Sequence, residues 1–196
     1  MKYFYVAIIA YLIGNISGSF LIGKLILDKD IRKYGSGNAG TTNAFRVMGK
    51  KYGILTFIID FIKGIVSSYL IIKFFGKEYV PFSIFFCVLG HNYPFYMNFK
   101  GGKGMATTLG AFAFLNFKLT LIPYMAWVLG TWITKMVSVG SISFFVVSMI
   151  VFTFFSDMEV FNILMINLIC LMGIYRHKSN IKRLINGTEN KIGGKK

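Results

Sequence analysis

The chain has 196 residues, of which 55% are hydrophobic and only 15% charged, and its mean hydropathy is +0.62. So many apolar side chains exceed what a soluble domain of this size can bury, which excludes an ordinary soluble protein and indicates an integral membrane protein. The net charge of +15 then indicates cytoplasmic loops, anionic membrane lipids or an anionic substrate, and we expect no nucleic-acid partner.

The sulfur and imidazole side chains argue against a metal site. Cys87 and Cys170 lie far apart in apolar runs and are expected to be buried as small hydrophobic residues. The two histidines form no cluster with them. We therefore expect no disulfide, no metal and no cofactor.

Apolar runs long enough for a membrane span of ~20 residues recur along the chain. The first could pass for a cleaved signal peptide, but its apolar character continues to Leu27, so a retained span is expected. Pro94 interrupts the third run near its end. The runs cover residues 3–27, 54–75, 79–99, 138–155 and 159–175.

The stretch 105–134 is too long for one comfortable span and short for two. Lys118, followed by Pro123, predicts a break there. Two short helices would give the chain seven spans, whereas one long tilted helix would give six.

The distribution of Lys and Arg favours seven spans with the N-terminus outside. In this topology residues 28–53, residues 100–104 and the tail from Arg176 lie in the cytoplasm, together with most of the basic side chains. Few remain outside: Lys2, Lys73, Lys77 and Lys118. We therefore expect an all-α polytopic protein, a single domain over residues 1–196, with seven transmembrane helices and a cytoplasmic C-terminus.

The same topology brings four polar segments to one face of the membrane, as a shared active site requires. They are GSGNAGTTN (35–43), FKGGKG (99–104), SVGS (138–141) and RHKSN (176–180). In the first, glycines let backbone N–H groups converge on an anion, and hydroxyls and amides add donors, with Arg46 nearby. A phosphate cradle and an ordinary polar loop both fit this composition.

The other polar segments also have two interpretations each. Lys100 and Lys103 could hold an anionic substrate or act as positive-inside anchors. Ser138 and Ser141 could belong to a site or cap a helix. His177, at the membrane surface, could donate to a phosphate or steer a hydroxyl, although its basic neighbours also fit interfacial anchoring.

Polar residues inside the spans are expected to be structural. Asp60 and Lys63 lie three residues apart on one helical face and should form an internal ion pair that positions a loop. His91, in GHNYP, is expected to be a satisfied core residue. Gly14 and Gly18 form a small-xxx-small pattern that predicts helix packing.

Two common catalytic arrangements are missing from the sequence. Neither His91 nor His177 is followed five positions later by an acid, since Tyr96 and Lys182 stand there, and no nucleophilic-serine elbow occurs. An enzyme built from these residues would work chiefly by positioning substrates and stabilising negative charge.

Four motifs in order resemble the acyl-phosphate:glycerol-3-phosphate acyltransferases, the PlsY family. They are DIRKYGSGNAGTTNAFRVMG, GHNYPFYMNFKGGKGMAT, VSVGSI and YRHKSNIKRLINGTENKIG, and the resemblance runs from about Gly14 to Gly193. It implies a seven-span bacterial inner-membrane enzyme, active at the cytoplasmic face, that moves an acyl chain from acyl phosphate to glycerol 3-phosphate and yields lysophosphatidic acid.

The resemblance also implies residue roles. The acyl-phosphate cradle would comprise Ser36, Gly37, Asn38, Gly40 and Thr42. Phosphates would be held and the acceptor oriented by Arg46, Lys103, Ser141, His177 and Asn180. Apart from the resemblance, we expect structural, supporting roles for Asn43, Asp60, Lys63 and His91. The family's usual Gly-Ala-Thr-Asn reads Gly-Thr-Thr-Asn at 40–43, and its Leu-Ala reads Val-Gly at 139–140.

Two other functions share part of this pattern. A transporter of an anionic metabolite would also have a basic cytoplasmic cluster and intramembrane charges, but it predicts polar residues on both sides of the bilayer. A non-catalytic lipid-binding protein predicts that residues 35–43 tolerate substitution. We expect an enzyme, a monomer, whose partners are acyl phosphate, glycerol 3-phosphate and membrane lipids.

Overall fold

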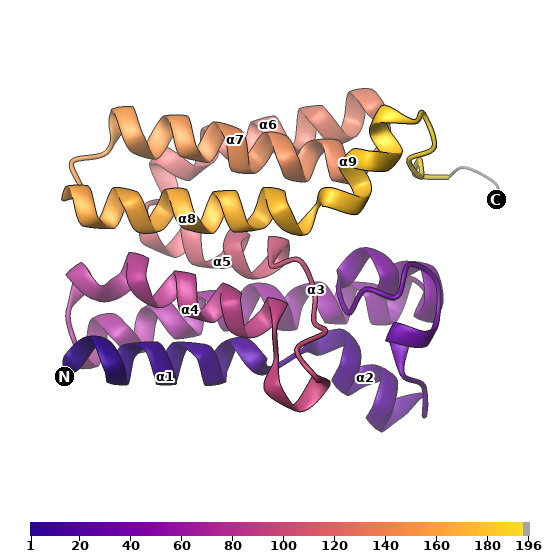
Figure 1. Cartoon of the computed structure of the whole chain (residues 1–196), viewed down its shortest axis with the longest axis horizontal. Helices are drawn as coiled ribbons and strands as arrows, with labels where there is room; N and C mark the ends of the chain where they lie inside the picture. Colours follow the sequence, from indigo (N-terminus) through magenta and orange to yellow (C-terminus); the bar gives the residue numbers. More distant parts are fainter. Residues whose placement is uncertain (194–196) are drawn as a thin grey trace. The chain divides into compact units, whose positions relative to one another are not determined.

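The computed structural model describes residues 1–193, and all regular elements in that range are helical (Figure 1). This confirms the all-α prediction. The chain divides into two compact units, Met1–Leu115 and Asn116–Lys196. Lys195 and Lys196 of the basic tail lie outside the described residues.

The first unit opens with a broken helix where the hydropathy predicts one continuous span. Helix α1 covers Lys2–Asn15 and α2 covers Gly18–Ile26, with a bend of 44° between them. The carbonyls of Gly14 and Ile16 at the break accept hydrogen bonds from the Lys63 ammonium. A buried cation therefore stabilises a break that local hydrophobicity does not indicate.

Helix α3, Thr41–Phe74, is longer than the apolar run at 54–75. It starts inside the segment expected to be a polar loop and is interrupted at Gly49, whose φ of 81° is accessible to glycine. Helix α4, Val80–Asn92, ends two residues before Pro94, as the sequence predicts. Helix α5 covers Met105–Leu115. Short 3₁₀ turns cover Ile31–Lys33, Lys77–Tyr79 and Phe95–Met97.

Helix pairs in this unit approach closely at glycines: α1 packs on α4, and α3 on α5. A Cβ on Gly14 would lie 2.0 Å from the Cys87 carbonyl oxygen, which confirms the predicted packing role of that glycine. The same holds reciprocally between α3 and α5: a Cβ on Gly64 would lie 2.2 Å from the Thr107 carbonyl oxygen, and a Cβ on Gly110 would lie 2.0 Å from the Phe61 carbonyl oxygen. Only glycine allows backbones this close.

We expect Gly110→Ala to destabilise the first unit by roughly 1–3 kcal/mol, because the new methyl group meets a backbone carbonyl that cannot rotate away. The matched control is Gly130→Ala in another apolar helix, where the nearest atom to the added Cβ lies 3.2 Å away. Thermal unfolding in detergent measures both. Equal melting temperatures for the two variants would contradict the close-packing explanation.

The second unit contains α6 (Phe117–Thr134), α7 (Val137–Phe155), α8 (Val160–Arg176) and α9 (Lys178–Ile185). Helix α6 packs on α7, and α7 on α8 (Figure 1). The stretch 105–134 is two helices, as expected, but the break lies at Asn116, whose side chain caps α6 by accepting from Leu119 N at 3.1 Å. The predicted break at Lys118–Pro123 is wrong, since both residues lie inside α6.

Among the described residues, α3 and α7 are each long and apolar enough to cross a membrane. Two bent pairs, α1 with α2 and α8 with α9, meet the same criterion together. Many large apolar side chains are exposed, including Ile58, Ile62 and Trp132, as expected for surfaces in contact with lipid. Length and composition thus support between two and four spans, and the count of seven stays a prediction.

Candidate active site

A buried asparagine holds the first polar segment. Asn43, in the first turn of α3, is 1% exposed. Its Oδ1 accepts from Ser36 N at 2.9 Å, and its Nδ2 donates to the Ile31 and Tyr34 carbonyls at 3.3 and 3.1 Å. Gly35 has φ of +60°, and a Cβ there would lie 2.3 Å from the same Oδ1. The loop is therefore fixed in one conformation by the helix it precedes.

The fixed loop presents the N-terminus of α3 together with exposed donors. Gly40 is the N-cap, and no side chain caps the helix. Free amides at a helix N-terminus, aided by the helix dipole, bind anions. Thr42 and Arg46, four residues apart and both exposed, lie on one face of α3. Ser36 and Gly37 are exposed and Asn38 is half-buried, so the arrangement can receive a phosphate.

Arg32 links this loop to the segment that precedes FKGGKG. Its guanidinium donates to both Asp30 carboxylate oxygens, at 2.9 and 2.7 Å, and to the Met97 carbonyl at 2.6 Å. It also lies 5.0 Å from the centroid of the Phe20 ring. The sequence alone does not indicate this role for Arg32, because an arginine in a basic loop is also what the positive-inside rule predicts.

We expect Asp30→Asn to reduce stability at neutral pH by ~1–2 kcal/mol, the usual value of a charge-assisted hydrogen bond. Hydrogen bonding from Arg32 holds the pKa of Asp30 below its ordinary value of 3.8. A depressed carboxyl pKa contributes stability above the unfolded-state pKa and loses it as pH falls through the native value. The melting-temperature difference between wild type and variant should therefore shrink below pH 3.8. Asp28→Asn, at an exposed carboxylate, is the control.

The glycine pair of FKGGKG rests on the end of α4. Gly101 N donates to the Asn92 carbonyl and Gly102 N to the His91 carbonyl, both at 3.1 Å. These carbonyls lack partners within the helix, so the loop completes its hydrogen bonding. Lys103 follows directly and is half-buried, whereas Lys100 is exposed. The approach to the loop passes through Asn98 and Phe99, both with positive φ.

Beneath this loop lies the buried group of Asp60, Lys63 and His91. The Lys63 Nζ lies 3.1 Å from Asp60 Oδ1, which is the ion pair that the sequence predicts. The same Nζ lies 2.8 Å from His91 Nδ1. Asp60 Oδ1 also accepts from Gly18 N at 3.3 Å. The three side chains join α3, α4 and the α1–α2 break into one polar contact inside the first unit.

The second unit gathers its candidate residues around a glutamate. Glu189 Oε1 accepts from Ser138 Oγ at 2.9 Å and from Asn180 Nδ2 at 2.8 Å, and its Oε2 accepts from Arg183 Nε at 2.7 Å. The Glu189 side chain is 6% exposed. Ser138 therefore does not cap α7, whose N-cap is Met136. The sequence alone does not indicate this role for Glu189, because it is an acid in a basic tail and no spacing pairs it with Ser138.

Ser141 and His177 are buried and oriented by their own helices. Ser141 Oγ donates to the Val137 carbonyl at 2.9 Å. His177 Nδ1 lies 2.7 Å from the Gly173 carbonyl. Because a carbonyl only accepts, Nδ1 carries a proton, and Nε2 is the atom that can accept when neutral or donate when charged. The ring also lies 6.1 Å from that of Phe145, so its plane is held from two sides.

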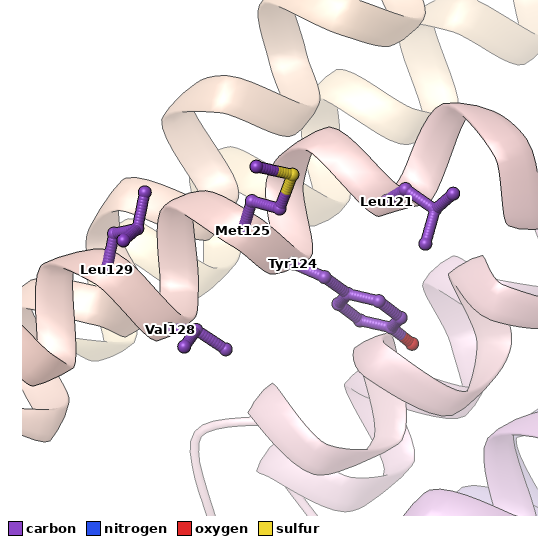
Figure 2. Close-up of a pocket in the computed structure, with 5 residues that line it drawn as sticks. All are labelled: Leu121, Tyr124, Met125, Val128 and Leu129. Atoms are coloured by element: carbon purple, nitrogen blue, oxygen red, sulfur yellow. The ribbon is translucent and has the colours of Figure 1, made fainter.

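Other local features do not suggest binding sites for phosphate or metal. An open apolar cavity of about 270 Å³ lies along α6 and is lined by Leu121, Tyr124, Met125, Val128 and Leu129 (Figure 2). Its lining carries no cation to hold a phosphate. Within residues 1–193, no three His, Cys, Asp or Glu side chains are grouped so that they could hold a metal ion.

The chain is an all-helical integral membrane protein. Each of its two units contains a cluster of polar side chains that includes at least one cation. A family described as glycerol-3-phosphate acyltransferase matches residues 4–187. Curated proteins of that name from Finegoldia magna and Aquifex aeolicus are 42% and 40% identical, covering 98% of this chain and 99% and 100% of their own.

Two solved structures are also similar to this chain. The crystal structure of PlsY, an integral membrane glycerol 3-phosphate acyltransferase, in its glycerol 3-phosphate form has a TM-score of 0.90 and 37% identity, covering 98% of this chain and 96% of that one. The form with lysophosphatidic acid has a TM-score of 0.87. The chain belongs to the glycerol-3-phosphate acyltransferase family, PlsY type.

Proposed function

We propose that the protein transfers a fatty acyl group from acyl phosphate to glycerol 3-phosphate, giving lysophosphatidic acid and inorganic phosphate. The observation that carries the proposal is the glycine loop at 35–40, held by Asn43 over the uncapped N-terminus of α3. This arrangement suits a phosphate. The solved relatives were crystallised with glycerol 3-phosphate and with the lysophosphatidic acid that acylation of it would give.

The two substrates are anions, so the residues must bring two negative groups together. The cradle of Ser36, Gly37, Asn38, Gly40 and Thr42 would bind the acyl phosphate. Its partners would be the cations and polar side chains that hold phosphates and orient the acceptor: Arg46, Lys103, Ser141, His177 and Asn180. Fixed donors of this kind stabilise developing charge without reorganising during the reaction.

The acceptor hydroxyl would attack the acyl carbon, forming the new ester C–O bond, and the bond from that carbon to the phosphate oxygen would break. Phosphate is already a good leaving group, so the chemistry needs chiefly alignment and charge stabilisation. A substrate phosphate would accept the hydroxyl proton, because the sequence has no paired carboxylates and neither histidine is followed five positions later by an acid.

The proposal is tested by the identity of the acyl donor that the protein uses. Purified protein is incubated with glycerol 3-phosphate and, in separate reactions, acyl phosphate, acyl-CoA or acyl carrier protein carrying the same chain. We expect lysophosphatidic acid from acyl phosphate alone. Product from acyl-CoA at a comparable rate would refute the proposed donor. Substrate flux into vesicles without covalent product would favour the alternative of an anion transporter.

We further propose a monomer in the bacterial inner membrane, with seven spans and all four polar segments at the cytoplasmic surface. The distribution of Lys and Arg supports this topology. Single cysteines at positions 36 and 178, in a variant whose Cys87 and Cys170 are replaced by alanine, should react with an impermeant maleimide only from the cytoplasmic side. Labelling of the two positions from opposite sides would refute the topology.

We expect Lys103→Ala and His177→Ala each to lower kcat/KM with acyl phosphate by roughly 10²-fold or more, the usual cost of one oriented donor at a charge that develops in the transition state. The matched control is Lys118→Ala, at an exposed lysine in α6. Initial rates of lysophosphatidic acid formation measure the three variants. Near-wild-type rates for both site variants would remove these residues from the active site.

A further inference from the structure

The imidazole of His91 lies directly against the backbone of Gly102. A Cβ on Gly102 would be 2.0 Å from His91 Nε2 and 2.9 Å from both Cδ2 and Cε1. The nearest obstacles are thus all atoms of this one ring. The ring is 3% exposed, and Gly102 N donates to the carbonyl of the same histidine. The loop that carries Lys103 therefore rests on the side chain as well as the backbone of His91.

The other edge of the ring is held by Lys63. An ammonium has no acceptor, so His91 Nδ1 accepts the 2.8 Å hydrogen bond from Lys63 Nζ, and the neutral ring carries its proton on Nε2. Lys63 in turn donates to the Gly14 and Ile16 carbonyls. The position of the ring is therefore set by α4, which carries it, and by Lys63, which joins α3 to the α1–α2 break, independently of the loop that lies on it.

We propose that His91 is a positioning residue that fixes Lys103 through Gly102, an inference that rests on the function proposed above. Gly102 contacts the ring and directly precedes Lys103 in sequence, so a shift of the ring moves the backbone from which the lysine side chain extends. Displacing a substrate-holding group by ~1 Å can cost ~10²-fold in rate or affinity. The imidazole thus has a role beyond filling the interior: it sets where the ammonium meets a phosphorylated substrate.

A double-mutant cycle between His91→Asn and Gly102→Ala tests the contact. Asparagine keeps an acceptor near Nδ1 for Lys63 but has no atoms in place of Nε2 and Cε1. We expect Gly102→Ala alone to raise KM for glycerol 3-phosphate or acyl phosphate by about tenfold or more, with a much smaller change in kcat. In the His91→Asn background the same change should raise KM less than threefold, because the obstructing ring atoms are gone.

Gly101→Ala is the matched control. A Cβ at Gly101 would meet the His91 carbonyl oxygen at 2.1 Å and Pro94 Cδ at 2.6 Å, neither of which the asparagine removes. His91→Asn should therefore leave the effect of Gly101→Ala unchanged. The proposal would be overturned if His91→Asn reduced the KM increase of both alanine variants, or of neither. It would also be overturned if His91→Asn alone left KM unchanged for both substrates.

Product formation, ligand binding and recovery of folded protein together distinguish failure of this proposal from failure of the proposed function. If wild-type protein makes no lysophosphatidic acid from acyl phosphate, the proposed donor fails. The double-mutant cycle then compares the affinities of the variants for glycerol 3-phosphate, measured as thermal stabilisation by the ligand. If Gly102→Ala does not fold, recovery of folded protein in the double variant supports the contact between His91 and Gly102. No recovery, together with unchanged ligand binding in His91→Asn, refutes the positioning role of His91.

Discussion

We expect Lys63→Met to lower the free energy of unfolding by about 3–5 kcal/mol, the cost of removing one partner from a buried ion pair. The side chains of Lys63 and Asp60 are 4% and 1% exposed. Removing the ammonium leaves the Asp60 carboxylate uncompensated and deprives the Gly14 and Ile16 carbonyls of their donor at the α1–α2 break. Thermal or denaturant unfolding in detergent measures the loss.

The double variant Asp60→Asn/Lys63→Met should recover part of this loss, because no buried charge is then left alone. Lys73→Met, at an exposed lysine near the end of the same helix, is the matched control and should be nearly neutral. A double variant no more stable than Lys63→Met would show that the carbonyl contacts, and not the charge pair, dominate. A neutral Lys63→Met would contradict the whole account of the break.

The second large effect is expected at Glu189. Glu189→Ala removes the acceptor for Ser138, Asn180 and Arg183 at once, and loss of this acceptor costs ~1–3 kcal/mol for each of the two buried donors, Ser138 and Asn180. We expect lower thermal stability and, because Asn180 belongs to the proposed site, a fall in kcat/KM of roughly 10²-fold from misplacement.

Glu189→Gln separates geometry from charge. Glutamine keeps one acceptor oxygen but cannot receive the charge-assisted bond from Arg183, so an intermediate loss is expected. Glu159→Gln, at an exposed glutamate in the same unit, should behave as wild type in unfolding and turnover. Equal losses in Glu189→Ala and Glu189→Gln would mean that the carboxylate charge is the essential feature.

Much of the architecture could be predicted because hydropathy and turn chemistry act locally. The apolar runs predict helices over α7 and α8, and Pro94 predicts the end of α4. Where the structure differs from the prediction, a distant residue or a local helix cap decided the outcome. Lys63 stabilises a break in the first helix from 47 residues away. The break before α6 lies at Asn116, whose side chain caps that helix, whereas Lys118 and Pro123 are accommodated inside it.

The candidate site shows the same division. Composition points to anion binding in the loop at 35–43, because glycines, amides and hydroxyls offer donors without knowledge of the fold. The roles of Lys103 and His177 come from the family resemblance and stay predictions. The contacts of Arg32 and Glu189 could not be predicted from composition, because they depend on burial and on partners up to 65 residues away. Composition encodes neither.

The sequence by itself determined that this chain is helical and embedded in a membrane, because the hydrophobicity of each side chain does not depend on the fold. Tertiary structure decided which polar groups are buried together: Lys63 with Asp60 and His91, and Glu189 with Ser138 and Asn180. The physical reason is that a buried charge must find partners within a few ångströms, and only packing brings residues from separate helices that close.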